Sequence, residues 1–537
     1  MSKANGMELP KGWAEATIED LFWPLDDGRT LHQGWSPQCE KTPAPTDDDW
    51  GVLKTTAIQA GAFLSQHNKH VPKHRDPRPQ VEVKAGDILM TCAGPRVRCG
   101  VACLVRNTRP RLMMSGKMYR FRVPPDHMDA RFLEAFLLTP KATAAIDKMK
   151  TGGSDSGLNL THDRFRPLPV PVAPLNEQRR IMDTIDELLS DLDAGVAALE
   201  RVRAKLKHFR AAVLKAAVEG ALTADWRTKH PDTEPACDLL ARILAERRRR
   251  WEQAQLKKFK AAGKAPPKGW KDKYQEPVAP NSIGLPALPG GWSWATVEQT
   301  GEVQLGRQRS PKNISKKYPT KYLRAANITE QGIDLSDVLE MEFTPRERMR
   351  YQLHPGDLLL SEASGSPRQV GKPAICGKDH AEYCFQNTVI RHQPLLVECS
   401  YLLFVYKCYY ATGVFATLSA GVGINHLSAA KFSQLSLPIP PSAEQLAIVE
   451  AVEDQLSVID HLESDLEAKL KSAQALRQSI LRHAFTGQLV PQVPSDEPAS
   501  ELLKRIADER EHRTRQANAT KSRKPPARRG RRKKNAT

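Results

Sequence analysis

The chain has 537 residues, a formal net charge of +18 and 40% hydrophobic residues, which is enough for several domains, each with its own core. The sequence contains no run of 18 apolar residues, and residues 1–10 lack the apolar stretch of a secretory signal, so a membrane or secreted protein is not expected. The nine cysteines include no Cys-x-x-Cys pair, which favours reduced thiols and a cytoplasmic protein.

The sequence contains an internal repeat, in which one pattern occurs twice. Leu-Pro-Lys-Gly-Trp at 9–13 returns as Leu-Pro-Gly-Gly-Trp at 288–292, and a Gly-Asp turn at 86–87 returns at 356–357. The longest match runs without a gap and aligns 168–222 with 435–489. Two copies are too few for a solenoid, so the repeat predicts two related modules with pseudo-twofold character.

Each copy begins with a predicted mixed module. Residues 1–167 contain short alternating runs such as 81–83 and 118–123, Gly/Pro turns, and a helical pattern over 130–149. Residues 288–434 repeat this scheme. We therefore predict an α+β fold with two similar mixed α/β modules.

Each module is followed by a predicted long helix, at 168–223 and at 435–490. Apolar residues recur there at spacings of three and four, and Gly220 and Gly487 are typical helix stops. At 1.5 Å per residue each helix is roughly 65–70 Å long. We expect the two helices to pair as an antiparallel coiled coil. The alternatives are that each lies on its own module or pairs between two chains.

The remaining segments are short and basic. Residues 224–287 are predicted to be a docking helix and a basic linker, 491–511 a second docking helix, and 512–537 a basic disordered tail. Most of the net positive charge arises from Arg247–Lys273 and Arg513–Lys534, where basic residues far outnumber acids. The tail is either a solubilising end or a sequence-independent contact to phosphates.

The sequence carries no recognisable catalytic signature. Gly365–Lys372 has the wrong spacing for a phosphate loop, and Pro373 stands where a Mg²⁺-binding hydroxyl is required. No His-Glu-x-x-His and no Asn/Asp-Pro-Pro-Tyr/Phe is present. Cys92, Cys99 and Cys103 lack metal-ligand spacing and are predicted to be buried thiols. We predict no catalytic, metal-binding or cofactor-binding residue, and therefore a recognition or scaffold protein rather than an enzyme.

Together, these features resemble the specificity (S) subunit of type I restriction–modification systems. The resemblance rests on an ordered set of segments that covers nearly the whole chain: 9–13, 222–227, 324–328, 356–359, 418–425, 437–445 and 477–481. The long basic linker and the basic tail depart from the family's pattern.

The resemblance implies a non-catalytic subunit in which each module, a target-recognition domain, reads one half of a bipartite double-stranded DNA sequence. It implies two methyltransferase (M) subunits and restriction/translocase (R) subunits as partners, with methylation at N6 of adenine. S-adenosylmethionine, ATP and Mg are then expected only in those partners. A helical ruler between two different modules would fix the separation of the half-sites, much as dimer spacing does in symmetric repressors.

Candidate DNA contacts follow from loop chemistry, because Arg can pair with guanine, Gln with adenine, and Ser with phosphate. The candidates are Lys54, Arg96 and Arg98 in the first module and Arg307, Arg309, Lys312, Ser364, Ser366, Arg368 and Gln369 in the second. The alternative to DNA recognition is a coiled-coil scaffold that binds only proteins.

Overall fold

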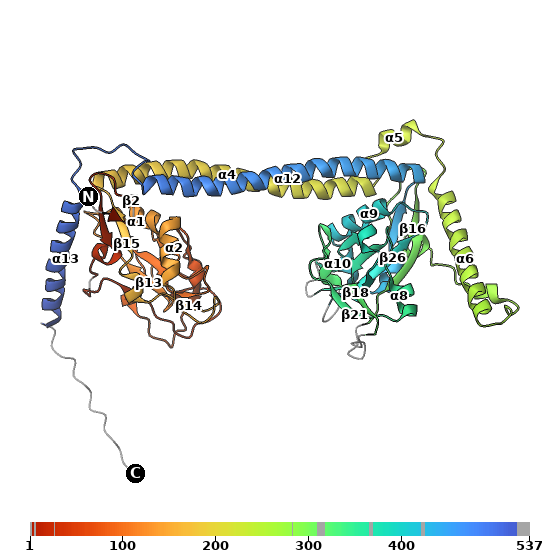
Figure 1. Cartoon of the computed structure of the whole chain (residues 1–537), viewed down its shortest axis with the longest axis horizontal. Coiled ribbons are helices and arrows are strands. Elements are labelled where there is room, and N and C mark those ends of the chain that lie inside the picture. Colours follow the sequence, from red (N-terminus) through yellow and green to blue (C-terminus); the bar gives the residue numbers. More distant parts are fainter. Residues whose placement is uncertain are drawn as a thin grey trace, which may run out of the picture. The chain divides into compact units, whose positions relative to one another are not determined.

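A computed structural model of the chain describes residues 3–4, 7–25, 27–281, 283–308, 317–364, 369–419 and 425–522. It forms two compact units, the first comprising 1–199 with 468–537 and the second 200–467. Each unit holds one mixed α/β module, part of both long helices and one docking helix (Figure 1). The first module is defined here as 7–172 and the second as 288–439. No helix among the described residues is long and apolar enough to cross a membrane.

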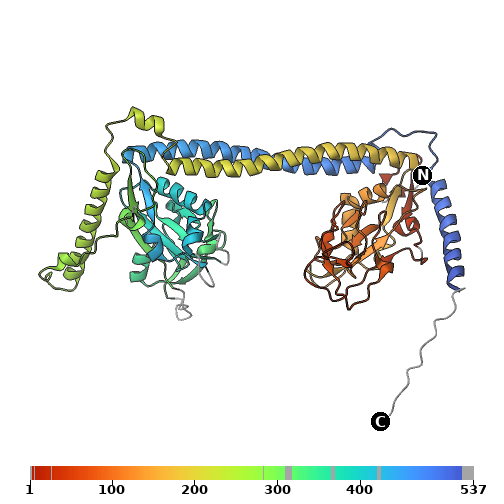
Figure 2. The same cartoon turned by 180° about the vertical axis from the view of Figure 1, so that it is seen from behind.

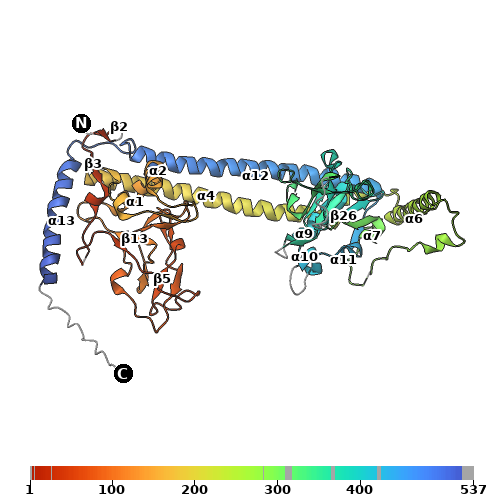
Figure 3. The ribbon, with the colours of Figure 1, turned by 60° about the horizontal axis from the view of Figure 1, so that its bottom comes forward.

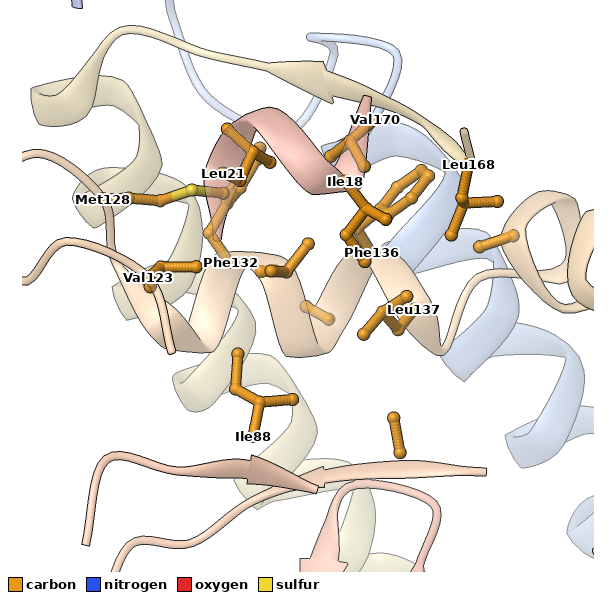
Figure 4. Packing of buried hydrophobic residues seen from close by; sticks show 14 of the residues in the cluster. Ile18, Leu21, Ile88, Val123, Met128, Phe132, Phe136, Leu137, Leu168 and Val170 are labelled. Atoms are coloured by element: carbon orange, nitrogen blue, oxygen red, sulfur yellow. The ribbon is translucent and has the colours of Figure 1, made fainter. Parts of the chain in front are cut away.

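The first module is built on a four-stranded antiparallel sheet in the order β11-β9-β13-β4. Strands β9 and β13 are buried at every position, so they form the centre of the sheet. Helix α1 lies between the strand that carries Ile88 and the segments that carry Ile18 and Val170 (Figure 4). Its Phe132 and Phe136 fill that core.

The elements of the first module are η1 (Ile18–Leu21), η2 (Thr55–Ala57), η3 (Pro79–Val81), α1 (Ala130–Leu137), α2 (Pro140–Met149), α3 (His162–Phe165), and strands β3 (Ala14–Thr17), β4 (His32–Gln33), β5 (Gly51–Leu53), β6 (Ile58–Gln59), β7 (Ala62–Phe63), β8 (Asn68–His70), β9 (Ile88–Thr91), β10 (Ala93–Gly94), β11 (Ala102–Leu104), β12 (Leu112–Met113), β13 (Met118–Phe121), β14 (Leu158–Asn159) and β15 (Pro169–Val172), with β1 (Lys3–Ala4) and β2 (Met7–Glu8) at the N-terminal end.

The second module repeats this plan (Figure 2). Its four-stranded sheet has the order β24-β22-β26-β17, and a smaller sheet has the order β21-β18-β25 with β25 parallel to β18. The first module has a matching smaller sheet, β12-β5-β8, in which β12 is parallel to β5. The predicted pair of similar mixed modules is therefore confirmed.

The elements of the second module are α7 (Val297–Thr300), η6 (Ala325–Asn327), α8 (Pro345–Tyr351), η8 (Lys378–His380), α9 (Cys399–Ala411), α10 (Val414–Ser419), α11 (Ala429–Ser433), and strands β16 (Ser293–Thr296), β17 (Gly301–Leu305), β18 (Pro319–Leu323), β19 (Ile328–Thr329), β20 (Gly332–Ile333), β21 (Leu339–Glu342), β22 (Leu358–Ser361), β23 (Ala363–Ser364), β24 (Pro373–Ile375), β25 (Cys384–Phe385), β26 (Val389–Pro394), β27 (Asn425–His426) and β28 (Ser436–Ile439).

The long helices are α4 (Leu175–Val218) and α12 (Ser442–Ala484), and they pair antiparallel within each unit (Figures 1 and 3). In the first unit Arg477 of α12 forms an ion pair with Asp193 of α4. In the second unit Arg210 of α4 pairs with Asp460 and, at 3.0 Å, with Glu463 of α12. The predicted intramolecular coiled coil is confirmed, and these contacts overturn both alternatives.

Each docking helix follows the long helix of one repeat but packs on the module of the other repeat. Helix α6 (Ala236–Ala261) follows α4, after the short α5 (Ala224–Lys229), but docks on the second module, where Ala236 N donates to Gly291 O over 2.8 Å. Helix α13 (Ala499–Ser522) follows α12 but docks on the first module, where Ala499 N donates to Gly12 O over 2.8 Å. Each module is therefore completed by a helix that its own repeat does not supply.

Several element boundaries differ from the sequence prediction. Residues 169–172 and 436–439 are strands β15 and β28, because β15 pairs antiparallel with β3 and β28 pairs antiparallel with β16. The long helices therefore begin at 175 and 442 rather than at 168 and 435. Much of the predicted linker belongs to α6, and α13 continues to Ser522 beyond the predicted limit of 511. The predicted strand at 81–83 is not formed: Val81 ends the 3₁₀ turn η3, and Glu82 makes only an isolated antiparallel bridge with Met113.

Candidate nucleic-acid interface

Two distant loops of the first module meet where β10 pairs with β14. Ala93 pairs with Asn159 and Gly94 with Leu158, and Thr151 closes the second loop by exchanging backbone hydrogen bonds with Asn159. The first loop cluster consists of residues 94–99 and 151–157. Gly94 has φ +144°, a conformation that L side chains rarely adopt. The pairing therefore presents two tight, polar loops on one surface.

Arg96 lies on the exposed side of the first loop cluster. Its guanidinium donates to Asp147 Oδ2 over 2.7 Å and to Asp155 Oδ1 over 3.0 and 3.1 Å, and its side chain is 44% exposed. The neighbouring Val97 is 82% exposed. Because Asp155 is itself 76% exposed, a phosphate or a guanine edge can replace it as the acceptor.

Arg98 points into the module instead. Its guanidinium donates to Thr55 O over 2.6 Å, to Ile58 O over 2.7 Å and to Gln59 Oε1 over 3.1 Å, which ties the loop to η2 and β6. Lys54, half-buried, is the N-terminal capping residue of η2, directly before Thr55. The fold thus brings Lys54, Arg96 and Arg98 to one region, but it engages Arg98 in holding the loop.

The second module builds the same arrangement. Strand β23 pairs with β27, so that Ala363 faces His426, whose ring lies 3.2 Å from both Glu362 oxygens. Ser361 Oγ donates to Gln369 O over 2.9 Å and accepts from Lys372 N over 3.0 Å. Thr91 fixes the equivalent loop of the first module, donating to Arg98 O and accepting from Val101 N.

These described residues, 362–364, 369–371 and 425–427, are the second loop cluster. Ser364 lies in β23 and Gln369 is exposed beside the Ser361 anchor. Four other predicted contacts lie outside the described residues: Arg309, Lys312, Ser366 and Arg368. The topology makes Gln369 the counterpart of Arg98, because each follows the loop that its module's Thr91 or Ser361 closes.

Arg307 has packing partners within its module. Its Nε donates to Glu347 Oε1 over 2.8 Å, its guanidinium lies 5.1 Å from the centroid of the Phe343 ring, and its side chain is only 12% exposed. These contacts join β17 to α8. A role of Arg307 in DNA binding stays a prediction. Its contacts with Glu347 and Phe343 give it a structural role within the module.

Helix α8 carries cations that the sequence analysis missed. A capping box between Thr344 and Glu347 starts the helix, and Arg346, Arg348 and Arg350 are exposed beyond it. The alternating arginines directly after Pro345 were the available signal. These three arginines belong to the same module as the second loop cluster, and their positive charge is suited to contacts with DNA phosphates.

The cysteines near the first loop cluster are buried, as predicted. Burial raises the pKa of Cys92 and of Cys103 to about 12, and it also raises the pKa of Cys99. These thiols therefore stay protonated and unreactive at neutral pH. In the described part of the chain, no group of three or more His, Cys, Asp or Glu side chains could hold a metal ion.

Comparisons with known proteins find similarity to specificity subunits of type I restriction enzymes. Residues 289–472 match the family model described as type I restriction modification DNA specificity domain. The chain is 36% identical over 211 residues to the type I restriction enzyme EcoEI specificity subunit of Escherichia coli, covering 39% of this chain and 34% of that subunit. It is 23% identical to the EcoKI specificity subunit of Escherichia coli strain K12 over 94% of this chain and 96% of that subunit.

A solved structure shares the fold. A chain from a study of complex assembly and conformational transition of the type I R-M system aligns with 90% of this chain and 100% of its own length, with a TM-score of 0.57 and 15% identity. The predicted resemblance to specificity subunits is confirmed by the family model and by the named relatives. The named relatives are specificity subunits, which agrees with the prediction of a recognition subunit.

Proposed function

We propose that this chain, whose residues 289–472 match a type I restriction modification DNA specificity domain, reads a bipartite DNA target with its two modules. The observation that carries the proposal is the repeated loop cluster: both modules pair a short strand after the Gly-Asp turn with a second loop, at β10–β14 and at β23–β27. The two modules share this strand pairing but differ in the residues of the loops that it joins. Two such surfaces suit two different half-sites.

The long helices set the separation of the half-sites in this proposal. Helix α4 has 44 residues and α12 has 43, so each is about 65 Å long at 1.5 Å per residue. Ion pairs and buried apolar residues join them within each unit. A spacer whose bases are not read would lie between the two half-sites.

The partners proposed for this chain are two methyltransferase subunits and restriction/translocase subunits. S-adenosylmethionine, ATP and Mg belong to those partners, and methylation at N6 of adenine is their reaction. The named relatives are specificity subunits of restriction enzymes, which supports this assignment. Because the proposed target is chromosomal DNA, we expect the assembly to act in the cytoplasm.

The proposal is tested by sequencing methylated adenine across the genome of a host that expresses the chain with its methyltransferase partner. The partner alone is the control. A bipartite motif that appears only with the chain is the expected result. A stable complex that adds no motif and shows no sequence-dependent DNA binding would instead favour a protein-binding scaffold.

Two variants of the chain test which module reads which half-site. We expect Arg96→Ala, in the first loop cluster, to relax one half of the motif and leave the other half and the spacer unchanged. The matched control is Gln369→Ala in the second loop cluster, which should act on the opposite half. If both substitutions changed the same half-site, the assignment of one half to each module would be wrong.

A further inference from the structure

The far end of α6 and the turn after it concentrate positive charge. Residues 257–273, named here the lysine arm, contain a single acid, Asp272, and seven lysines: Lys257, Lys258, Lys260, Lys264, Lys268, Lys271 and Lys273. All seven lysine side chains are exposed. This charge lies outside the two loop clusters, so the proposed function does not account for it.

The lysine arm has a fixed structure. Trp270 stacks on Trp251 of α6 with ring centroids 5.9 Å apart, and Phe259 meets Trp270 edge-on at 6.0 Å. Tyr274 packs on Trp251 at 5.3 Å. At the end of α6, Gly263 has φ +64° and donates to Lys260 O over 3.1 Å. These contacts fold the segment back on α6 and order the backbone that carries the lysines, which lowers the backbone entropy lost when a ligand binds.

The acids in the middle of α6 pair mainly with the arginines that precede the arm and with one lysine of the arm, Lys271. Glu246 pairs with Arg249 at 2.5 Å and with Arg250 at 2.9 Å, and Glu252 pairs with Arg248 and Lys271. In the described part of the chain, no ion pair involves the first five lysines of the arm, 257, 258, 260, 264 and 268. The arm therefore carries a surplus of charge that its own fold does not use.

The equivalent helix of the other unit uses its cations differently. In α13, Arg510 donates to Glu19 O over 2.7 Å, and Arg513 lies 4.8 Å from the centroid of the Trp23 ring. Both arginines thus dock α13 on the first module. In α6 this task falls to Arg247, which donates to Gly301 O over 2.6 Å. The lysines beyond it are not needed for docking.

We propose that the lysine arm binds the phosphate backbone of duplex DNA beside the recognised sequence. This inference rests on the proposed function. Lysine acts as a point charge on phosphate, and a row of lysines binds DNA without reading its sequence. An acidic protein surface is the less suitable partner, because interfaces between proteins are depleted in lysine.

The test measures how DNA affinity of the complex with the methyltransferase partner depends on salt. The variant carries Lys257→Gln, Lys258→Gln, Lys260→Gln and Lys264→Gln together, and duplexes with and without the methylated motif are compared. Each lost phosphate contact should reduce the slope of log K against log salt by about 0.9. We expect a reduction of about 2 to 4, equal on both duplexes.

Two matched variants serve as controls. Lysine-to-arginine changes at the same four positions keep the charge and should keep the slope. Changing Lys205, Lys207, Lys469 and Lys471 to Gln removes the same charge from exposed positions of α4 and α12 and should also keep it. A reduction of less than about 0.9 in the arm variant, or an equal reduction in the α4/α12 control, would overturn the proposal.

The outcomes separate the two proposals. If the unaltered complex shows no preference for its motif, the proposed function fails whatever the arm does. If that preference is intact and the arm variant keeps its salt slope, only the lysine arm proposal fails. Loss of methyltransferase binding with an unchanged slope would identify the arm as a protein contact and would also overturn it.

Discussion

The indole Nε1 of Trp292 donates a hydrogen bond to Glu444 Oε2 over 2.9 Å in the second unit. The first unit repeats the bond between Trp13 and Glu177 at 3.0 Å. In each case the tryptophan opens a module and the glutamate lies in the first turn of the long helix. One buried bond therefore fixes each module to its helix.

The two copies of this bond differ in what surrounds the carboxylate. Glu444 also accepts from Thr223 Oγ1 over 2.6 Å and from the Arg227 guanidinium. Glu444→Ala leaves that arginine and two further donors without their acceptor, so we expect a loss of about 3–5 kcal/mol in the stability of the second unit. Glu177→Ala should cost the first unit only about 1–2 kcal/mol. Denaturant unfolding followed by hydrogen exchange in each unit measures both.

Glutamine variants are the controls for this pair. Glu177→Gln keeps an acceptor for Trp13, and because burial raises the pKa of the Glu177 carboxyl, the neutral amide should be tolerated almost without cost. Glu444→Gln removes the charge that faces Arg227 and should remain clearly destabilising. Equal costs in the two units would contradict the interpretation.

Features with a strong local pattern could be predicted from the sequence, and features made by distant contacts could not. The apolar spacing of residues such as Ile181 and Ile448 is enough to predict a long helix, because the pattern repeats along many turns. Nothing local indicates that Ala499 docks on Gly12. The same limit applies to the candidate site. Arg98 lies in a polar loop, yet only the fold shows that its guanidinium binds Thr55 and Ile58.

The glycines that end the long helices make a second matched pair. Gly220 has φ +72°, and a Cβ there would lie 2.7 Å from Pro289 Cγ; Gly487 has φ +69°, with Pro10 Cγ at 2.5 Å. Gly263 ends α6 at φ +64° with open space around it. Gly263→Ala should cost only the left-handed backbone, about 1–2 kcal/mol. Gly220→Ala and Gly487→Ala should cost about 1–3 kcal/mol more, because the proline must move.

Chemical denaturation of the three alanine variants measures these differences. A Gly220→Ala variant as stable as Gly263→Ala would mean that the Leu-Pro-x-Gly-Trp segment does not pack closely on the end of α4. Hydrogen exchange near Trp292 would report the same packing directly.

The two arginines of the first loop cluster should separate stability from DNA affinity. Arg98→Ala removes the guanidinium hydrogen bonds to Thr55 O, Ile58 O and Gln59 Oε1, so we expect a loss of about 1–3 kcal/mol in stability. Arg96→Ala removes only solvent-exposed ion pairs, so the stability of the unit should change little. It should nevertheless weaken binding to the motif by about 1–3 kcal/mol. Thermal unfolding and fluorescence anisotropy with labelled duplex measure the two effects.

Arg98→Lys is the control for this comparison. Lysine keeps the charge but lacks the fork that reaches both carbonyls, so its stability should stay close to that of Arg98→Ala. If Arg98→Lys were as stable as the unaltered chain, the inward hydrogen bonds would not be what holds the loop.

His392 should make the second unit sensitive to acid. Burial lowers its pKa from 6.5 to about 3, and its ring shares a 2.8 Å hydrogen bond with Tyr406. In the unfolded chain His392 binds a proton near pH 6.5, whereas in the folded unit it stays neutral down to about pH 3. The contribution of His392 to the stability of the second unit is therefore fully present above pH 6.5 and is lost as the pH falls toward 3. Between pH 7 and pH 5 the expected loss is about 2 kcal/mol.

The matched variant His392→Gln cannot take up this proton, so its stability should lose that part of the pH dependence. Asp357 works in the opposite direction, because burial raises its pKa and its contribution to stability is lost as the pH rises. The informative quantity is therefore the difference between the two proteins at each pH, measured by urea unfolding with hydrogen exchange in β22 and β26. Parallel curves for the two proteins between pH 7 and pH 5 would show that His392 is not the group that responds, because every other titrating side chain is common to both.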